Sequence, residues 1–492
     1  MSLYQKKPFW ILGSIFVLGF IALFMIRLDL IQKYFFRTQS LPISAIKSPG
    51  DKETWMNIVQ SHRKIGFSHS RFSAEQDGYR LQETVRMRIN TMGMVQDINL
   101  KTIGRLNRDF SLADFDFNIK SGRFNFNVTG SVSGDVLTVR TNSAGASREA
   151  DIPLKAKPYL LPAITAAMSA AELNSGDKYT FDIFDPATMG QTAVMVEVLG
   201  KEDLQVMGEI QSATKVALNF KDTSQLAWIG DSGEVLKEKG ILGIQLEKTT
   251  RQDALRGLAA AASADLTQAA SLASNVLLED LDRLATLRVE ISGIPLQVVQ
   301  LNGGRQAFKA NILTIEKETM TNFPADIHER NLQNLEKVFL KPGPFIQSDD
   351  QKIQNLAQEI AGTHAAPLDK VRMLVEWVYK NIDKRPVLSL PDALSTLDNR
   401  VGDCNEHAVL LAALARAAGI PCRVEAGLVY LKGRFYYHAW NLVYLGRWIT
   451  VDAVYDQVPA DVSHIRLVTG SPSQQLDLIG IIGKLQLRVL DH

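Results

Sequence analysis

Cysteine is scarce in this chain of 492 residues, which contains only Cys404 and Cys422. Two cysteines cannot build the disulfide framework of a small secreted domain. They are also poorly placed to pair with each other, because a helix from Cys404 to Ala418 would be about 21 Å long. The four residues on to Cys422 retrace at most about 14 Å, whereas a disulfide needs Cα atoms about 5.5 Å apart. We therefore expect Cys404 to be a free thiol.

The sequence also lacks the usual signatures of metal, nucleotide and nucleic-acid binding. It contains no CxxC, HExxH, P-loop or EF-hand pattern, so we expect neither a metal ion nor a cofactor. The formal net charge is +1, and no long basic stripe offers a field for a polyanion. Nucleic acid is therefore not an expected partner.

The overall composition is that of a folded protein of more than one domain. Hydrophobic residues make up 46% of the chain and charged residues 22%, which is close to the globular average. A chain of this length can form about two to four domains, each with a core of its own.

One long apolar run lies near the N-terminus, over residues 9–26 (FWILGSIFVLGFIALFMI). A bilayer is spanned by about 20 such residues. The run continues into RLDLIQKYFF and has no small-residue cleavage site, which favours an uncleaved anchor over a signal peptide. Basic residues flank both ends, so charge does not decide the orientation of the segment.

The rest of the chain predicts an α+β protein. Alternating segments such as YRLQETVRMRIN and RFNFNVTGSV, separated by turn signals, indicate antiparallel hairpins, with one short helix at LLPAITAAMSAAEL. We interpret this β-rich region as a scaffold or recognition domain. The predicted order is a membrane anchor at 1–37, a linker at 38–52, a β-rich domain at 53–250, an Ala-rich helical segment at 251–285, a β segment and connector at 286–345, a domain that carries both cysteines at 346–470 and a C-terminal tail at 471–492.

Both cysteines lie in one stretch, GDCNEHAVLLAALARAAGIPCR, at residues 402–423. Asp403 and Glu406 fit a capping box, which makes Cys404 the first residue of an apolar, centrally buried helix. The partial positive charge of a helix N-terminus favours the thiolate, and its unpaired N–H groups can face a substrate oxyanion. The alternative is an inert cysteine that fills the core.

Three predicted strands follow this helix, in CRVEAGLVYL, FYYHAWNLVYL and RWITVDAVYD. A three-residue turn centred on Gly446 would place Asp452 opposite Trp440 and diagonal to His438, within side-chain reach. Considered singly, His438 could be a structural histidine and Asp452 could be a carboxylate that caps a turn. Together with Cys404 they predict a nucleophile, a base that takes and returns its proton, and a carboxylate that orients the base.

These blocks, with the following QVPADVSHIRL, resemble the transglutaminase-like superfamily in its bacterial, membrane-tethered form. The resemblance covers about residues 350 to 470 and implies a papain-like core with Cys404, His438 and Asp452 as the catalytic residues. It also implies a single-pass protein of the bacterial inner membrane whose catalytic domain faces the periplasm. Animal relatives use calcium, but no dedicated loop for calcium is present in this sequence.

Neighbouring residues have weaker assignments. Trp440 is a candidate substrate-binding residue that walls the groove or supports the oxyanion, and simple packing is the alternative. We expect His407 to support the site indirectly, Glu406 to act as a cap or core hydrogen-bond partner, and Cys422 to be structural.

The sequence therefore predicts a membrane-anchored thiol enzyme that acts on peptide or side-chain amides through an acyl-enzyme. Hydrolysis, as in a peptidase or amidase, is the preferred outcome. The alternatives are a cross-linking acyltransferase and a non-catalytic binding or assembly protein with the same fold. The expected partners are a protein or peptide substrate and the inner membrane.

Overall fold

The structure is a computed structural model and describes residues 50–492, except 92–93, 123, 144–145, 172, 221–222, 258–264, 297–298, 324–336, 363–365, 388–390, 471–477 and 479. The predicted anchor at 1–37 and nearly all of the linker lie outside these described residues. Within them, no helix combines the length and the apolar character that crossing a bilayer requires.

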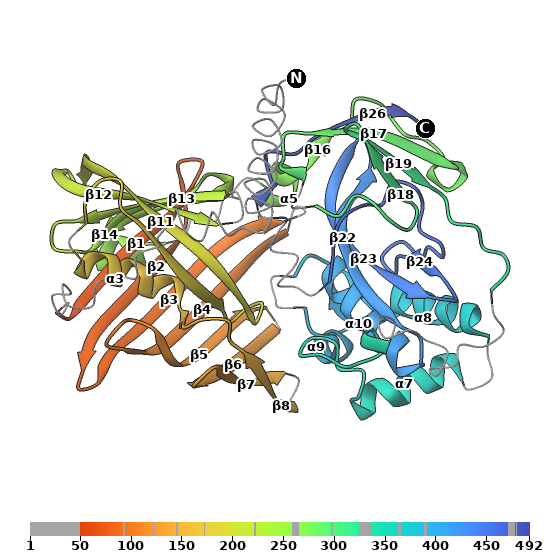
Figure 1. Cartoon of the computed structure of the whole chain (residues 1–492), viewed down its shortest axis with the longest axis horizontal. Helices are drawn as coiled ribbons and strands as arrows, with labels where there is room; N and C mark the ends of the chain where they lie inside the picture. Colours follow the sequence, from red (N-terminus) through yellow and green to blue (C-terminus); the bar gives the residue numbers. More distant parts are fainter. Residues whose placement is uncertain are drawn as a thin grey trace, which may run out of the picture.

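A large curved sheet of 15 strands forms one half of the molecule (Figure 1). Its first eight strands form one meander and its last seven another, and the two are joined where β1 pairs with β15. All neighbours are antiparallel except β9 and β10, which confirms the predicted antiparallel β-rich architecture. The strands are β1 (Lys52–Gln60), β2 (Arg63–Glu75), β3 (Gly78–Thr91), β4 (Met94–Asn107), β5 (Leu112–Ser121), β6 (Phe124–Ser133), β7 (Val136–Ser143), β8 (Ala146–Pro153), β9 (Pro158–Tyr159), β10 (Lys178–Asp185), β11 (Gly190–Val206), β12 (Glu209–Phe220), β13 (Thr223–Gly230), β14 (Val235–Lys239) and β15 (Ile244–Thr249).

Helix α3 (Leu161–Ala170) closes the core of this sheet. Ala163 and Ala167 pack with residues of the first meander, while Ile164 and Met168 pack with residues of the second. One helix therefore fills the space between the two halves. Its start fits the sequence, because a proline is tolerated in the first turn, where the amide has no partner in the helix.

The other half of the molecule packs helices against a smaller sheet (Figure 1). The sheet order is β16-β23-β22-β25, and β24 also pairs with β23. Helices α7 and α8 precede the cysteine helix, and the sequence analysis did not predict α9 or β25. The elements are α7 (Gln351–Ala361), α8 (Pro367–Asn381), β20 (Asp383–Lys384), α9 (Ala393–Asn399), β21 (Val401–Gly402), α10 (Cys404–Ala417), β22 (Cys422–Leu431), β23 (Arg434–Tyr444), β24 (Trp448–Val451) and β25 (Ile465–Thr469).

The Ala-rich segment 251–285, which the sequence predicts to be helical, is helical only in part of its described residues. Only α4 (Arg251–Leu255) and α5 (Leu266–Ala270) are α-helical, and β16 (Leu272–Ala273) pairs with Phe435 and Arg434 of β23. A short 3-10 turn, η3 (Leu281–Arg283), follows. Helix propensity is a weak preference, and pairing with an available strand edge overrides it here.

The C-terminal segment is also more than the predicted tail. Strand β26 (Gln486–Asp491) pairs with β17 (Thr286–Ser292) in a sheet that continues through β19 (Ile312–Glu316) to β18 (Gln306–Lys309). Val489 is buried against this sheet. The pairing joins residues that lie almost 200 positions apart, so local sequence did not reveal it.

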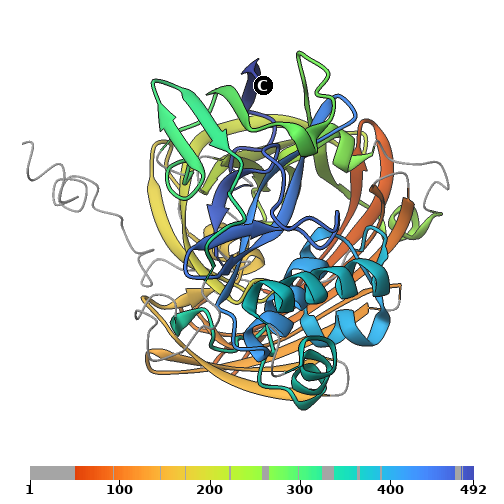
Figure 2. The same cartoon turned by 90° about the vertical axis from the view of Figure 1, so that its right-hand side faces the viewer.

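The two halves contact each other directly. In Figure 2 the half with the helices faces the viewer, in front of the large sheet. The Phe345 ring lies 6.3 Å from that of Phe126 in β6 and joins the core of the large sheet. Arg148 in β8 donates to the Asp349 carboxylate at 2.7 Å, just before helix α7. The segment that directly precedes helix α7 is thus fastened to the β-rich half.

Candidate active site

Cys404 is the first residue of helix α10, as the capping-box motif predicted. The Asp403 carboxylate accepts a hydrogen bond from the Asn405 amide at 2.9 Å, and the Glu406 carboxylate accepts one from the Asp403 amide at 3.0 Å. The helix that follows is buried almost throughout, because nearly all of its side chains are apolar. Both cysteines are free thiols, which confirms the argument against a disulfide.

Strand β23 lies against the N-terminal part of α10. The buried Asn441 amide donates to the backbone carbonyl of Ala408 at 2.8 Å and so ties strand to helix. One turn earlier on the helix, the backbone N–H of Ala439 faces the sulfur of Cys404 and acts to lower the pKa of its thiol. The thiol therefore lies beside the residue that follows His438.

His438 and Asp452 meet as the predicted register requires. Asn441 pairs with Val451 and Tyr444 with Trp448, which leaves a three-residue turn between the strands. Gly446 in that turn has a φ of 82°, a conformation that favours glycine. Nε2 of His438 lies 2.6 Å from Oδ2 of Asp452, a short distance typical of a hydrogen bond with an ionised partner.

This contact leaves the second nitrogen of the His438 ring free to act on the thiol. With Nε2 on the carboxylate, the Nδ1 side remains for a group on the other side of the ring. Asp452 is itself fixed, since its Oδ1 accepts the Val454 amide at 2.6 Å. Asp452 is 1% exposed and His438 8% exposed, so little water competes for the pair.

The sequence argument for an acidic thiol is not supported by the electrostatics. Burial raises the pKa of the Cys404 thiol well above its usual value, and the nearby Asp403 carboxylate adds to the rise. The Ala439 N–H acts in the other direction but does not offset them. The helix N-terminus favours a thiolate, yet desolvation and a capping carboxylate act on the same atom and outweigh it. These effects favour the thiol form of Cys404, which would need a base to act as a nucleophile.

Fewer first-turn amides are available for an oxyanion than the sequence suggested. The Asp403 side chain occupies the amides of Asn405 and Glu406, and its carbonyl accepts from His407 at 3.1 Å. The Cys404 amide makes no hydrogen bond within the described part of the chain. It is the one group of this turn that remains for a developing negative charge.

A second histidine, His464, was missed. Its Nε2 lies 2.9 Å from Oδ2 of Asp452, and its Nδ1 lies 3.2 Å from Oδ1 of Asp461. Despite burial, hydrogen bonds and charge interactions with these two carboxylates raise the pKa of His464 to about 9. The available signal was Asp-x-x-His in QVPADVSHIRL, a block that we quoted without giving its residues a role.

The remaining predicted residues are buried. Trp440 is 1% exposed, donates its indole N–H to Glu425 at 3.2 Å and packs beside the rings of His438 and His464. These contacts fit the packing alternative for Trp440. His407 lies with Nδ1 2.7 Å from the Asp403 carbonyl, and burial lowers its pKa.

Cys422 is fully buried in the core, next to Asn441. Burial raises the pKa of its thiol to about 12. Both observations agree with the structural role predicted for it.

His438, Asp452 and His464 are also residue types that can bind a metal, and their ligand atoms lie within 4.8 Å of one another. The nitrogen to oxygen distances of 2.6 and 2.9 Å are those of hydrogen bonds. Each of these atoms already has a protein partner, so we interpret the cluster as a hydrogen-bonded chain.

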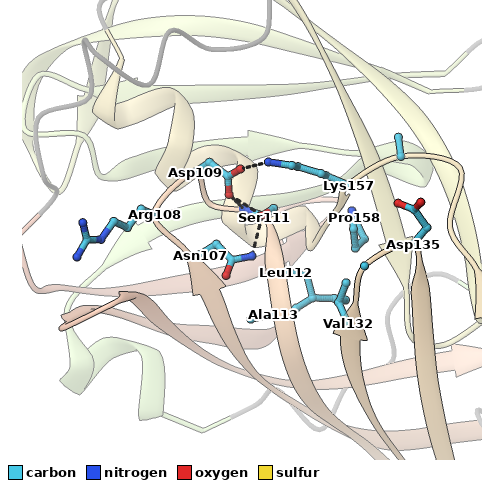
Figure 3. A pocket seen from close by; sticks show the side chains of 12 residues that line it. Asn107, Arg108, Asp109, Ser111, Leu112, Ala113, Val132, Asp135, Lys157 and Pro158 are labelled. Atoms are coloured by element: carbon cyan, nitrogen blue, oxygen red, sulfur yellow. Dashed lines mark hydrogen bonds and ion pairs between the residues drawn. The ribbon is translucent and has the colours of Figure 1, made fainter.

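A separate pocket of about 520 Å³ lies at the loops of the large sheet (Figure 3). Asp109 accepts there from Ser111 and from Lys157, whose ammonium lies 2.8 Å away. The lining comes entirely from residues 107–158. The pocket is therefore no part of the Cys404 site.

Comparison with known proteins agrees with this geometry. Residues 354–453 match the model of the transglutaminase-like superfamily. This part of the chain is a transglutaminase-like domain. The match spans the cysteine helix, strand β23 with His438, and Asp452 directly after β24. No curated protein matches the chain.

Several solved structures are similar to parts of the chain. A candidate cysteine protease from Cytophaga hutchinsonii is 20% identical, with 41% of this chain and 83% of that chain covered and a TM-score of 0.30. The periplasmic domain of TgpA from Pseudomonas aeruginosa is 22% identical, with coverages of 35% and 71% and a TM-score of 0.24. A β-barrel-like DUF1849 protein from Brucella abortus is 12% identical, with coverages of 41% and 97% and a TM-score of 0.32.

Proposed function

We propose that the transglutaminase-like domain is a thiol hydrolase that cleaves peptide or side-chain amides through an acyl-enzyme on Cys404. The observation that supports this most is the 2.6 Å contact between His438 and Asp452, next to a thiol that faces the Ala439 amide. A buried carboxylate that orients an imidazole beside a sulfur is the arrangement that activates a weak nucleophile.

The first half of the reaction forms a thioester. His438 takes the thiol proton as the sulfur bonds to the amide carbon, because the raised pKa of Cys404 leaves little thiolate at rest. The Cys404 amide and the positive end of α10 stabilise the oxyanion. The carbon–nitrogen bond then breaks, and His438 returns its proton to the departing amine.

The second half restores the enzyme. Water gives a proton to His438 as its oxygen attacks the thioester carbon, and the carbon–sulfur bond breaks. The thiol regains its proton and the carboxylic acid leaves. Throughout, Asp452 holds one tautomer of His438 and stabilises the imidazolium that forms.

Transfer to an amine is the second candidate reaction, because an amine can replace water at the thioester. A peptide library offered with and without a primary amine separates the two. Hydrolysis products in both samples support the proposal, whereas isopeptide products without hydrolysis show an acyltransferase. The Cys404→Ala variant removes either activity, and Cys422→Ala serves as the matched control that retains it.

A binding or assembly role is the rival from another class. In that case Cys404→Ala would keep full biological activity, and Cys404 would resist iodoacetamide at neutral pH. The intact set of Cys404, His438 and Asp452 favours the enzyme.

We also propose that residues 9–26 anchor the protein in the inner membrane, with the catalytic domain in the periplasm. The uncharged apolar run supports a membrane anchor, and the family resemblance supports a catalytic domain on the periplasmic side of the membrane. An alkaline phosphatase fused to the C-terminus is expected to be active. A fusion that stays inactive although it is expressed would place the domain in the cytoplasm.

A further inference from the structure

The carboxylate of Asp452 serves two histidines at once. Its Oδ2 accepts from Nε2 of His438 at 2.6 Å and from Nε2 of His464 at 2.9 Å. Its Oδ1 accepts from the Val454 amide. The proposed catalytic mechanism uses His438 and Asp452 but assigns nothing to His464.

His464 lies between two carboxylates. Its other nitrogen, Nδ1, is 3.2 Å from Oδ1 of Asp461, and the whole residue is 1% exposed. A neutral imidazole has one N–H and one lone pair, so it can donate to only one of these carboxylates. The imidazolium donates to both, and it is the form that satisfies this geometry.

The partner on the far side is fixed in place. Asp461 accepts from the Ser463 amide and from the Gln457 side chain, both at 2.8 Å. The Arg305 guanidinium donates to the backbone carbonyls of Asp461 and His464 at 2.9 and 3.2 Å. The position of the His464 ring is therefore set by the connection between β24 and β25.

Few other charges reach the His464 ring. Tyr455 faces it from the turn after β24, and burial raises the pKa of that phenol far above neutrality. Trp440 presents only an aromatic edge or face. Arg305 is paired with Glu318 at 3.2 Å and contacts the backbone of His464. The titratable groups that face the ring are Asp452, Asp461, His438 and Tyr455.

We propose that His464 is a positioning residue of the Cys404 site, a fixed cation that holds Asp452 toward His438 and offsets part of its negative charge. The catalytic meaning of this role rests on the proposed thiol hydrolase. The effect of the His464 charge on the reactivity of the Cys404 thiol can be measured without a substrate.

Removal of the positive charge on His464 should change the pKa of the site in a definite direction. A positive charge near a group favours its deprotonated form, so removal of the charge makes the site lose its protons at higher pH. The rings of His438 and His464 are 5.9 Å apart, and a charge at this range shifts a pKa by about 1 or more. Removal of the negative charge of Asp461 should instead lower the pKa of the site, or leave it unchanged if His464 then loses its own proton.

The test measures the rate at which iodoacetamide alkylates Cys404 between pH 5 and 10, followed by mass spectrometry of the Cys404 peptide. The full chain is compared with His464→Gln, whose amide still donates to Asp452 without a charge, and with Asp461→Asn. The apparent pKa of the reaction is expected to rise by about 1 in His464→Gln and not to rise in Asp461→Asn. An unchanged apparent pKa in His464→Gln, or a rise of equal size in both variants, overturns the proposal.

A second measurement does not depend on the stability of a variant. Nitrogen NMR of the 15N-histidine-labelled wild type reports whether both nitrogens of the His464 ring carry a proton at pH 7.5. An imidazolium supports the proposal and a neutral ring overturns it. Absence of amide cleavage would instead count against the proposed function, and it would leave both of these results standing.

Discussion

The side-chain amide of Asn441 binds the backbone carbonyl of Ala408 across 2.8 Å, inside the core between strand β23 and helix α10. This hydrogen bond joins the element that carries His438 to the element that begins with Cys404. It helps to set how far apart the proposed base and the proposed nucleophile lie, although Asn441 and Ala408 are themselves buried.

Replacement of Asn441 by Ala is expected to lower the free energy of unfolding by about 1–3 kcal/mol, from the lost hydrogen bond and the cavity left behind. It should also slow the reaction of Cys404 with iodoacetamide at neutral pH, because the two elements are no longer tied. Urea unfolding and peptide mass spectrometry measure the two effects. Asn399→Ala, which removes a side-chain hydrogen bond to the backbone within α9 and leaves the bond between β23 and α10 in place, is the control that should spare reactivity. Equal alkylation rates of Cys404 in the two variants would contradict the role of the Asn441 hydrogen bond in holding β23 against α10.

Gly427 is expected to tolerate no side chain. It pairs with His438 in β23, and a Cβ at this position would lie 2.0 Å from the Ile465 carbonyl of β25. Gly427→Ala should therefore push apart β22 and β25 and destabilise the protein by about 1–3 kcal/mol. Gly343→Ala, where a Cβ meets open space, is the matched control and should be near neutral. A variant at Gly427 that is as stable as the wild type in thermal unfolding would show that the strands separate freely.

The charged state of His464 predicts how stability depends on pH. The pKa of His464 is raised to about 9, above its value of about 6.5 in an unfolded chain, so the imidazolium contributes its full stability below about pH 6.5. This contribution is lost as pH rises through about 9. The difference in unfolding free energy between wild type and His464→Gln should therefore shrink from pH 6.5 to pH 9.5. A difference that stays constant over this interval would contradict a titrating group at 464.

Two half-buried carboxyls in the large sheet, Glu83 and Glu238, predict a substitution that stabilises the protein instead of destabilising it. Burial raises the pKa of Glu238 to about 7, and burial together with the charge of Glu238 raises that of Glu83 to about 7. Such groups contribute stability below their unfolded pKa of about 4.3 and lose it as pH rises through about 7. Glu238→Gln should therefore stabilise the protein at pH 8 by about 1–3 kcal/mol and have little effect at pH 4. The exposed Glu209→Gln is the control, and equal effects of the two variants at pH 8 would contradict burial as the cause.

The sequence predicted the parts of the site that local rules determine. The capping box placed Cys404 at the start of its helix, and an odd turn at Gly446 set the register that brings Asp452 to His438. The alternation of the N-terminal strands likewise predicted an antiparallel β-rich fold. Each of these features depends on residues that are neighbours along the chain or across one hairpin.

The features that were missed depend on distant contacts. His464 reaches Asp452 only because β25 folds back onto β22, and β26 pairs with β17 across almost 200 positions. The pKa of Cys404 depends on how completely the surrounding chain excludes water, which a helix position alone does not state. Propensity likewise predicted helix where β16 instead pairs with an edge of β23.

The central claim is that His438 activates a thiol that is otherwise protonated. Its most direct test is the alkylation rate of Cys404 at pH 7 in the wild type and in His438→Ala, with Cys422 as the internal reference thiol. The account predicts that Cys404 reacts much faster than Cys422 in the wild type and that His438→Ala slows it at least about tenfold. Equal rates in the two proteins, with the fold of the variant intact, would contradict it.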